Sequence, residues 1–169
     1  AGIVPDIVTL GKPMANGHPV GGVVANADVV NAFRKAFRYF NTFGGNPVSC
    51  AAAMAVLDVI EDEKLVENAR DVGGYTRDAF KRLAQKHAII GDVRGSGLFM
   101  GMEFVLDRAT KAPAAAGASR IVNDMRERGV LMGKIGLHQC ATKIRPPMPF
   151  SRENADLMLS VFDDVLSGL

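Results

Sequence analysis

A lysine follows the first apolar run of the sequence, at a place where it could bond to a carbonyl compound. Lys12 follows residues 7–10 after a single glycine, Gly11, and precedes the glycine- and proline-rich residues 13–22. The apolar run is typical of a buried strand, so the lysine at its exit is expected to be held by rigid backbone and partly desolvated. Desolvation lowers the pKa of an amine and frees the lone pair that Schiff-base formation requires. The alternative is a solvated surface charge, which is the commoner role of lysine.

A second candidate lies in residues 42–47, where two glycines precede the start of a helix. Asn46 followed by Pro47 predicts an N-cap and a first helical residue. Free N–H groups and the macrodipole at a helix N-terminus favour an anion, and Thr42 adds a hydroxyl. A phosphate would fit there. The alternative is an ordinary glycine-containing loop that Asn46 caps.

Arg145 is an isolated charge in an apolar setting, between Ile144 and two prolines. A guanidinium at such a place could bind a carboxylate through two parallel hydrogen bonds. The alternative is an ion pair with one of the chain's own 18 acidic residues.

The histidines and cysteines form no pattern that predicts a metal site. His18, His87 and His138 are scattered, and His18 is interpreted as a loop residue with a local hydrogen bond. Cys50 and Cys140 lie far apart and outside any metal-binding spacing, which predicts two free, buried thiols in a reduced cytoplasm.

Composition indicates a globular protein. Of the 169 residues, 48% are hydrophobic and 22% are charged, which excludes a disordered or fibrous chain. The net charge is +2 without any run of basic residues, so no nucleic-acid or anionic-membrane partner is expected. The longest uncharged stretch, residues 39–57, contains too many glycines and polar residues to be a membrane span.

The candidate residues must be positioned by a small set of elements. In the first third we expect strands at 7–10 and 23–24, a helix capped by Asp28, irregular backbone at 39–45, and an all-round apolar helix at 48–60. The later elements are expected to be a helix over 65–83 weakened at Gly73-Gly74, strands at 89–93 and 98–105 around a turn at 95–97, a helix through 121–125 stopped by Gly129, short strands at 130–132 and 142–145, and a last helix capped by Ser151.

Four stretches together resemble the class III aminotransferases, which are pyridoxal-phosphate enzymes. They are PDIVTLGKPMANGHPVGGVV (5–24), FNTFGGNPVSCAAAMAVLDVI (40–60), VRGSGLFMGMEF (93–104) and IRPPMPFSRENAD (144–156). The motif GKPMANGHP (11–19) is most similar to the sequences of the branch that contains the alanine–glyoxylate aminotransferase 2-like proteins and the phosphoamine phospho-lyases. Ala15 stands where that branch usually has glycine, which leaves Lys12 untouched.

The resemblance implies roles for the three candidates. Lys12 would form the internal aldimine with pyridoxal 5'-phosphate and then move the proton between the substrate α-carbon and the cofactor. Thr42 would hydrogen-bond the phosphate of the cofactor held by the partner subunit of a homodimer. Arg145 would take the substrate carboxylate, and no metal is implied.

The resemblance also implies an α/β fold, that of the fold-type I, aspartate aminotransferase-like transferases. Residues 1–62 would be the tail of the large cofactor domain, and residues 63–169 the small α+β domain. The chain is therefore expected to be a C-terminal piece, with little activity alone.

The expected reaction is transamination between a small amine or amino acid and a keto acid. One alternative is a phospho-lyase acting on a phosphorylated amino alcohol, and another is a non-catalytic dimerisation module that retains the fold.

Overall fold

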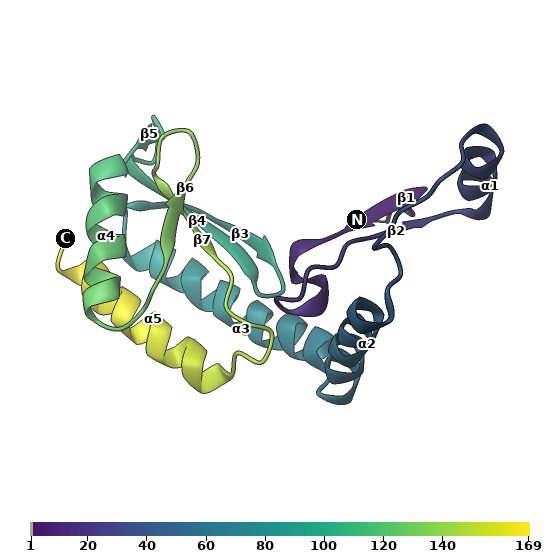
Figure 1. Ribbon diagram of the computed structural model, residues 1–169. Coiled ribbons are helices and arrows are strands. Elements are labelled where there is room, and N and C mark those ends of the chain that lie inside the picture. Colours follow the sequence, from purple (N-terminus) through teal and green to yellow (C-terminus); the bar gives the residue numbers. More distant parts are fainter. Residues whose placement is uncertain (1) are drawn as a thin grey trace. The chain divides into compact units, whose positions relative to one another are not determined.

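The computed structural model describes residues 2–169, which fall into two compact units (Figure 1). The first unit ends at Glu63, and the second comprises Lys64–Leu169. Each unit has its own sheet, and each is described in turn.

The first unit begins with a hairpin that carries Lys12. Strands β1 (Ile7–Leu10) and β2 (Gly22–Ala25) pair antiparallel, and a single 3-10 turn, η1 (Lys12–Ala15), follows β1. Both predicted strands are confirmed. The predicted burial of the first is wrong, because Ile7 is 52% exposed and every β1 residue is exposed. A two-stranded sheet offers no second layer to cover these side chains.

Helix α1 (Ala27–Ala36) follows β2, but its cap differs from the prediction. Asn26, not Asp28, is the N-cap, and its Oδ1 accepts a hydrogen bond from Val29 N at 3.0 Å. The Asn26 Nδ2 donates to Asp6 Oδ1 at 2.9 Å, which also fixes this side chain to the chain before β1. Asp28 lies in the first turn instead, where its negative charge interacts favourably with the positive end of the helix macrodipole.

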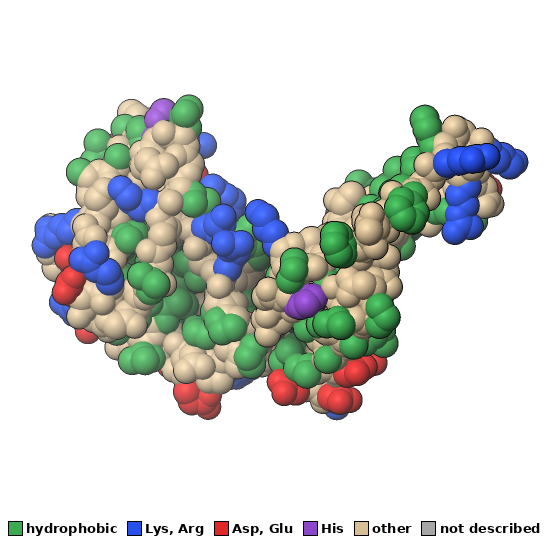
Figure 2. Space-filling model, in the orientation of Figure 1, with side chains coloured by type: hydrophobic (Ala, Val, Ile, Leu, Met, Phe, Trp, Pro, Cys, Tyr) green, Lys and Arg blue, Asp and Glu red, His purple; other side chains and the backbone are tan. Residues whose placement is uncertain are grey.

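Helix α2 (Pro47–Asp62) begins as predicted. Asn46 Oδ1 accepts a hydrogen bond from Ser49 N at 2.9 Å, and Pro47 is the first helical residue. The helix is apolar on most sides, yet only Ala53 is buried, and Met54 and Leu57 are more than half exposed. The hydrophobic side chains spread over this unit's surface in Figure 2 are therefore uncovered apolar area.

The second unit is an antiparallel sheet with helices on one face (Figure 1). The strand order is β3 (Ile90–Ser96), β4 (Phe99–Asp107), β7 (Ala141–Ile144) and β6 (Gly133–Ile135), and the short β5 (Ala112–Pro113) pairs with β4. The covering helices are α3 (Leu65–Lys86), α4 (Ala115–Glu127) and α5 (Arg152–Ser167).

The core of this unit lies between the sheet and the helices. Met100, Met102 and Phe104 share one face of β4 as predicted, and all three are almost completely buried. Phe162 of α5 packs edge-on against Phe80 of α3 with 5.6 Å between ring centroids, and it stacks on Phe104 at 6.4 Å. The alternate residues of β4 face away from the helices.

Two strand predictions in this unit are wrong in their bounds. The strand expected at 130–132 lies at Gly133–Ile135, because Val130 N donates to Met125 O at 2.9 Å and Val130 is thereby held in the turn that follows α4. The residues expected to form a turn at 95–97 extend β3 as far as Ser96. The last helix begins as predicted, with Ser151 and Asn154 forming a reciprocal cap.

Both cysteines are free thiols, but only Cys140 is buried. Cys50 is exposed on α2, so the prediction of two buried thiols is wrong for Cys50. None of the helices formed by residues 2–169 combines the length and the hydropathy that crossing a membrane would require.

Candidate functional site

Lys12 lies at the first position of the turn that follows β1. Its φ is 45°, in the left-handed region that non-glycine residues rarely adopt, and Asn16 at the end of the same turn has φ 46°. Backbone strain of this kind is concentrated at functional sites. The turn is closed by hydrogen bonds from Met14 N to Gly11 O at 3.3 Å and from Asn16 N to Pro13 O at 3.0 Å.

The side chain of Lys12 is exposed in the first unit. The expected partial desolvation is therefore absent from the chain as described, because β1 itself is uncovered. Ala15, in contrast, is only 5% exposed. Its methyl group faces inward in a turn that packs on α2, so alanine at this position is accommodated.

A histidine connects the Lys12 turn to the start of α2. His18 Nε2 lies 2.9 Å from Ser49 Oγ, 31 residues away along the chain. The predicted local hydrogen bond for His18 is therefore wrong, since its side-chain partner is distant in sequence. A single sequence holds no signal for this pair, because neither residue type at its position specifies the other.

The loop before α2 contains the second candidate, Thr42, whose side chain is exposed. Asn41 Oδ1 accepts hydrogen bonds from Phe43 N at 3.1 Å and from Gly44 N at 3.0 Å, so two backbone donors of this loop are already bonded. Among residues 2–169, the Thr42 hydroxyl and Val48 N have no partner. Val48 N lies in the first turn of α2, where a free donor suits an anion, and Thr42 lies in the loop before that helix.

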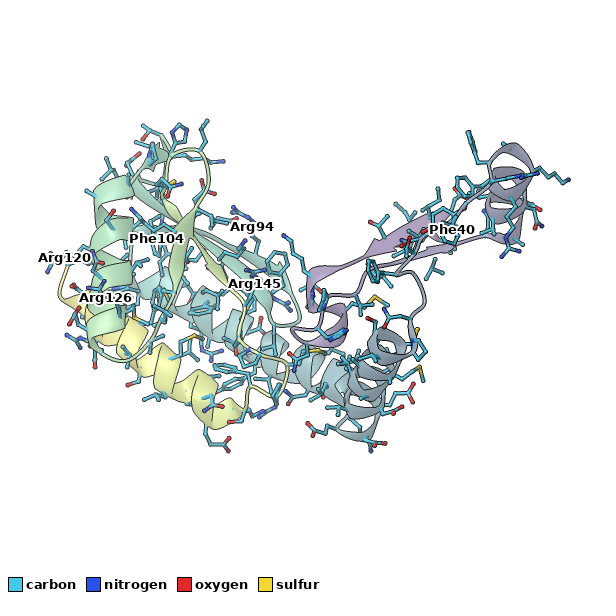
Figure 3. The ribbon with its side chains drawn as sticks, in the orientation of Figure 1. Phe40, Arg94, Phe104, Arg120, Arg126 and Arg145 are labelled. Atoms are coloured by element: carbon cyan, nitrogen blue, oxygen red, sulfur yellow. The ribbon has the colours of Figure 1, made fainter. Side chains whose placement is uncertain are left out.

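The third candidate, Arg145, directly follows β7 in the second unit (Figure 3). Thr142 and Ile144 are buried under the helices, so the alternation of a strand directs Lys143 and Arg145 to the opposite face of the sheet. Arg145 is exposed and forms no ion pair with any carboxylate in the described part of the chain. The alternative that it neutralises one of the chain's own acidic residues is therefore not what the structure shows.

The segment after Arg145 is anchored to α3. Asn68 Nδ2 donates to Met148 O at 2.7 Å and to Phe150 O at 3.1 Å. The two prolines that follow Arg145 restrict the intervening backbone further. The direction in which the chain leaves β7 is therefore fixed on both sides of Arg145.

A hollow of about 740 Å³ adjoins Arg145 in the second unit. The residues that line it include Lys143 and Arg145 and no acidic residue. Figure 2 shows Lys and Arg side chains gathered over the strands of this unit, where no helix covers the sheet. The remaining lining consists of Gly129–Gly133, Ile144, Pro146, Pro147, Phe150, Asn154, Leu157 and Met158.

Nearby basic groups differ in whether they are already paired. Arg94 of β3 donates to Asp92 and to Glu103 Oε2 at 3.0 Å, and these two carboxylates raise the pKa of the Arg94 guanidinium. Gly101 of β4 pairs with Arg94 on one side and with Lys143 of β7 on the other, so these two basic residues lie in the same row across the sheet. Lys143 forms no ion pair among residues 2–169. Lys143 was missed by sequence reasoning, although its spacing of two from Arg145 places both on one face.

The site residues thus fall into two groups. Lys12 and Thr42 belong to the first unit. The hydrogen bond between His18 and Ser49 joins the segment after the Lys12 turn to α2, the helix that follows Thr42. No hydrogen bond joins Lys12 directly to Thr42 in the described chain. Arg145 belongs to the second unit.

Comparison with known proteins gives consistent results along the whole chain. A mitochondrial alanine–glyoxylate aminotransferase 2 homolog of Arabidopsis thaliana is 47% identical over 167 residues, which are 99% of this chain and 35% of that protein. A phospholyase from Arthrobacter, solved in complex with phosphoethanolamine, is 42% identical with a TM-score of 0.94, over 99% of this chain and 40% of that one. An amine transaminase from an uncultivated Pseudomonas species, solved in a PLP-bound form, is 34% identical with a TM-score of 0.88, over 99% and 39%.

The chain spans about a third of the length of the curated relatives it matches. The structural neighbours confirm the expected fold, since they superpose on both units with high TM-scores. The family model described as Aminotransferase class-III matches residues 1–166. The chain therefore belongs to the class-III aminotransferase family.

Proposed function

We propose that this chain is part of a pyridoxal-phosphate-dependent enzyme that transfers the amino group of a small amine or amino acid to a keto acid. The observation that carries the proposal is Lys12, a lysine held at φ 45° by the turn at the exit of β1. Membership of the class-III aminotransferases and the PLP-bound transaminase neighbour support it. Pyridoxal phosphate supplies, when bound, an aldehyde that condenses with amines and a conjugated ring that accepts electrons from the substrate α-carbon.

The residues of the first unit suit this cofactor. Lys12 Nζ is the exposed amine that would form the Schiff base with the aldehyde. The Thr42 hydroxyl and Val48 N, near the positive end of α2, would be donors for a phosphate oxygen of the cofactor that the partner subunit holds. When it is not bonded to the aldehyde, Lys12 Nζ would be an amine able to take a proton from the substrate α-carbon and to return it to the cofactor.

Arg145 is the group proposed to orient the substrate. Its guanidinium is exposed and carries no carboxylate of the chain, so its donors remain available for a carboxylate of the substrate. Two parallel hydrogen bonds would fix the direction of the α-carbon as well as hold the charge.

Absorption spectroscopy tests the role of Lys12. A protein that carries these residues within a chain of its relatives' length should give a band near the edge of the visible range when pyridoxal phosphate is added. The Lys12→Ala variant should lose the band, whereas Lys35→Ala, which removes an exposed lysine of α1, should keep it. Persistence of the band in Lys12→Ala would overturn the assignment.

A phospho-lyase is the second candidate function, and one comparison favours it. The Arthrobacter phospholyase, crystallised with phosphoethanolamine, covers 99% of this chain at 42% identity. The unpaired cations Lys143 and Arg145 would suit a phosphate as well as a carboxylate. Release of free phosphate from phosphoethanolamine without a keto-acid acceptor would exclude the transaminase and establish the lyase.

We also propose that the protein acts as a homodimer. The first unit exposes many large apolar side chains, among them Phe40, Phe43 and Val48. Apolar areas beyond a few hundred Å² are rare on soluble monomers, which supports coverage by further protein. The third candidate is a non-catalytic dimerisation module that retains the fold. It predicts a dimer by light scattering and no absorbance band when pyridoxal phosphate is added.

A further inference from the structure

We propose that Asn68 of α3 is a positioning residue for Arg145 and thereby helps to select amines that carry a carboxylate. It acts through residues 146–150, the proline segment, which follows Arg145 and leads to α5. The inference rests on the proposed function, in which Arg145 binds the substrate carboxylate. Every residue that it uses belongs to the second unit.

The proline segment has few groups of its own that could hold it in place. Pro146, Pro147 and Pro149 have no backbone N–H to donate. The ladder between β7 and β4 has already ended at Ile144. Within the segment, Phe150 N donates to Pro147 O at 3.0 Å, which closes one turn. A hydrogen bond that attaches the segment to another element therefore has to come from an outside donor that reaches its carbonyl groups.

Asn68 is such a donor. Its Nδ2 donates to Met148 O at 2.7 Å and to Phe150 O at 3.1 Å. The NH2 group has one proton for each carbonyl, whereas the opposite amide orientation would place Oδ1 against two further acceptors. In the described part of the chain, these are the only side-chain hydrogen bonds that reach residues 145–150 from another element. Figure 1 shows the segment passing α3 on its way from β7 to α5.

The stiffness of this backbone carries the effect of Asn68 to Arg145. A proline ring fixes its own φ, and it also restricts the residue before it, which applies to Arg145 and to Met148. The backbone between these two residues can therefore bend little, so a shift at Met148 also moves Arg145. On the other side Ile144 is only 5% exposed and is held in the core. Asn68 thus helps to set the direction in which Arg145 leaves the sheet.

The side chain of Arg145 has no contacts of its own that would replace this support. It is exposed, and among residues 2–169 it forms neither a hydrogen bond nor an ion pair within the chain. A carboxylate bound through two parallel hydrogen bonds requires both N–H groups of the guanidinium to be aligned. Loss of the Asn68 bonds should therefore lower the preference for a carboxylate-bearing amine by about threefold to tenfold.

The experiment measures this preference in a protein that carries the chain at its relatives' length and is loaded with pyridoxal phosphate. Alanine and ethylamine, which differ by the carboxylate, are added separately and without a keto acid, so that only the first half-reaction occurs. The decay of the absorbance band at several amine concentrations gives a second-order rate constant for each amine. The ratio of the two constants is the carboxylate preference.

Two variants remove the donor in different ways. Asn68→Ala deletes both hydrogen bonds and leaves α3 intact, since alanine is the better helix former. Asn68→Asp keeps the size of the side chain but replaces the donor by an acceptor. We expect both to lower the carboxylate preference by about threefold to tenfold while ethylamine reacts as before. A preference equal to that of wild type in both variants would overturn the proposal.

Tyr75→Phe is the matched control. It removes the hydrogen bond from Tyr75 of α3 to Asp156 of α5 and leaves the bonds of Asn68 in place. The carboxylate preference should therefore stay as in wild type. A loss as large as that of Asn68→Ala would mean that general contact between α3 and α5 is responsible, and the proposal would fail.

Hydrogen exchange gives a readout that does not depend on activity. The amides of Met148 and Phe150 should exchange faster in Asn68→Ala than in wild type, and Tyr75→Phe should leave them unchanged. Unchanged exchange in Asn68→Ala would show that other contacts hold the proline segment, and the proposal would be wrong.

Arg145→Met keeps this inference distinguishable from the proposed function. The variant should lose the carboxylate preference, and Asn68→Ala added to it should lower the preference no further. A further loss would show that Asn68 acts on another part of the site, which contradicts the inference. If Arg145→Met keeps the preference, the proposed role of Arg145 fails and the inference fails with it. If Arg145→Met loses the preference while Asn68→Ala keeps it, only the inference fails.

Discussion

Gly73 of α3 lies directly against the backbone of Gly97. A Cβ on Gly73 would come within 2.1 Å of the Gly97 carbonyl oxygen, a distance that no carbon and oxygen can adopt without bonding. The sequence predicts that Gly73-Gly74 weakens this helix, but α3 runs unbroken through both residues, and Gly73 has a packing role. It is the place where the turn between β3 and β4 meets the helix, and only a residue without a side chain permits the contact.

The first prediction uses the neighbouring glycine as its control. Gly73→Ala should lower the free energy of unfolding by about 1–3 kcal/mol or more, since the turn must move to make room. Gly74→Ala should raise it by up to about 1 kcal/mol, because a Cβ on Gly74 meets nothing within 4 Å and alanine is the better helix former. Urea unfolding of both variants measures the difference. Similar effects at the two positions would contradict the contact.

A second prediction concerns Arg108, which closes the end of α3. Its guanidinium donates to the carbonyl oxygens of Ala84, of His87 at 3.0 Å and of Ala88 at 3.1 Å. These carbonyls lie at the helix C-terminus, where a positive charge is favourable. Arg108→Met should therefore cost about 1–3 kcal/mol of unfolding free energy.

The control for Arg108 is Arg126, which is exposed and, among residues 2–169, pairs only with the adjacent Glu127. Arg126→Met should change the unfolding free energy by less than about 0.5 kcal/mol, as surface ion pairs contribute little. Arg108→Lys should not restore the unfolding free energy, because one ammonium group cannot reach the three carbonyls in the geometry of a guanidinium.

The third prediction is a pH dependence at Asp163 of α5. Hydrogen bonds from Lys86 Nζ at 2.7 Å and from His87 Nε2 at 2.6 Å lower the pKa of this carboxyl below its ordinary value of 3.8. A lowered folded-state pKa contributes stability that is present above pH 3.8 and is lost as the pH falls through the folded value. Wild type should therefore lose more unfolding free energy than Asp163→Asn between pH 5 and pH 3.

Asp78 provides the comparison for Asp163. It forms an exposed pair with Lys81 at 3.7 Å, and Asp78→Asn should leave the acid dependence of unfolding close to that of wild type. If Asp78→Asn reduces the acid dependence as much as Asp163→Asn, the effect belongs to overall charge and not to the contacts of Asp163.

The fourth prediction follows from a buried hydroxyl. Thr142 Oγ1 is fully buried on the helix-covered face of β7 and has no hydrogen-bond partner among residues 2–169. An unsatisfied buried hydroxyl is costly, so Thr142→Val should raise the free energy of unfolding by about 1–2 kcal/mol. Thr76→Val should not, because the equally buried Thr76 Oγ1 donates to Val72 O at 2.7 Å. Equal stabilisation by both substitutions would show that only the added methyl matters.

The accuracy of sequence reasoning depended on how local each interaction is. The caps at Asn46 and Ser151 were predictable, because each is made by a side chain to a backbone group three residues away. Asp28 was mistaken for a cap because Asn26, two positions earlier, is an equally suitable residue type and has a second partner in Asp6.

Contacts between residues far apart in the chain cannot be predicted from this single sequence. The bond between His18 and Ser49 joins a loop residue to the first turn of α2, and the close approach at Gly73 depends on a turn 24 positions later, at Gly97. Lys143 is the intermediate case: the alternation that places Arg145 on the open face of the sheet places Lys143 there too. The position of Lys143 on this face is therefore predictable from the sequence, although nothing in the residue type distinguishes it from an ordinary surface lysine.

The last prediction concerns Arg145 and its substrate. If Arg145 binds a carboxylate through two parallel hydrogen bonds, Arg145→Lys keeps the charge but loses the second bond. Turnover of an amine that carries a carboxylate should then lose about 1.5–3 kcal/mol of transition-state stabilisation, measured as kcat/KM. Amines without a carboxylate should be affected much less. The comparison isolates the geometry of the guanidinium, because Arg145→Lys keeps a positive charge at this position. An equal loss for both kinds of amine would mean that Arg145 maintains the shape of the chain after β7 and does not bind the substrate.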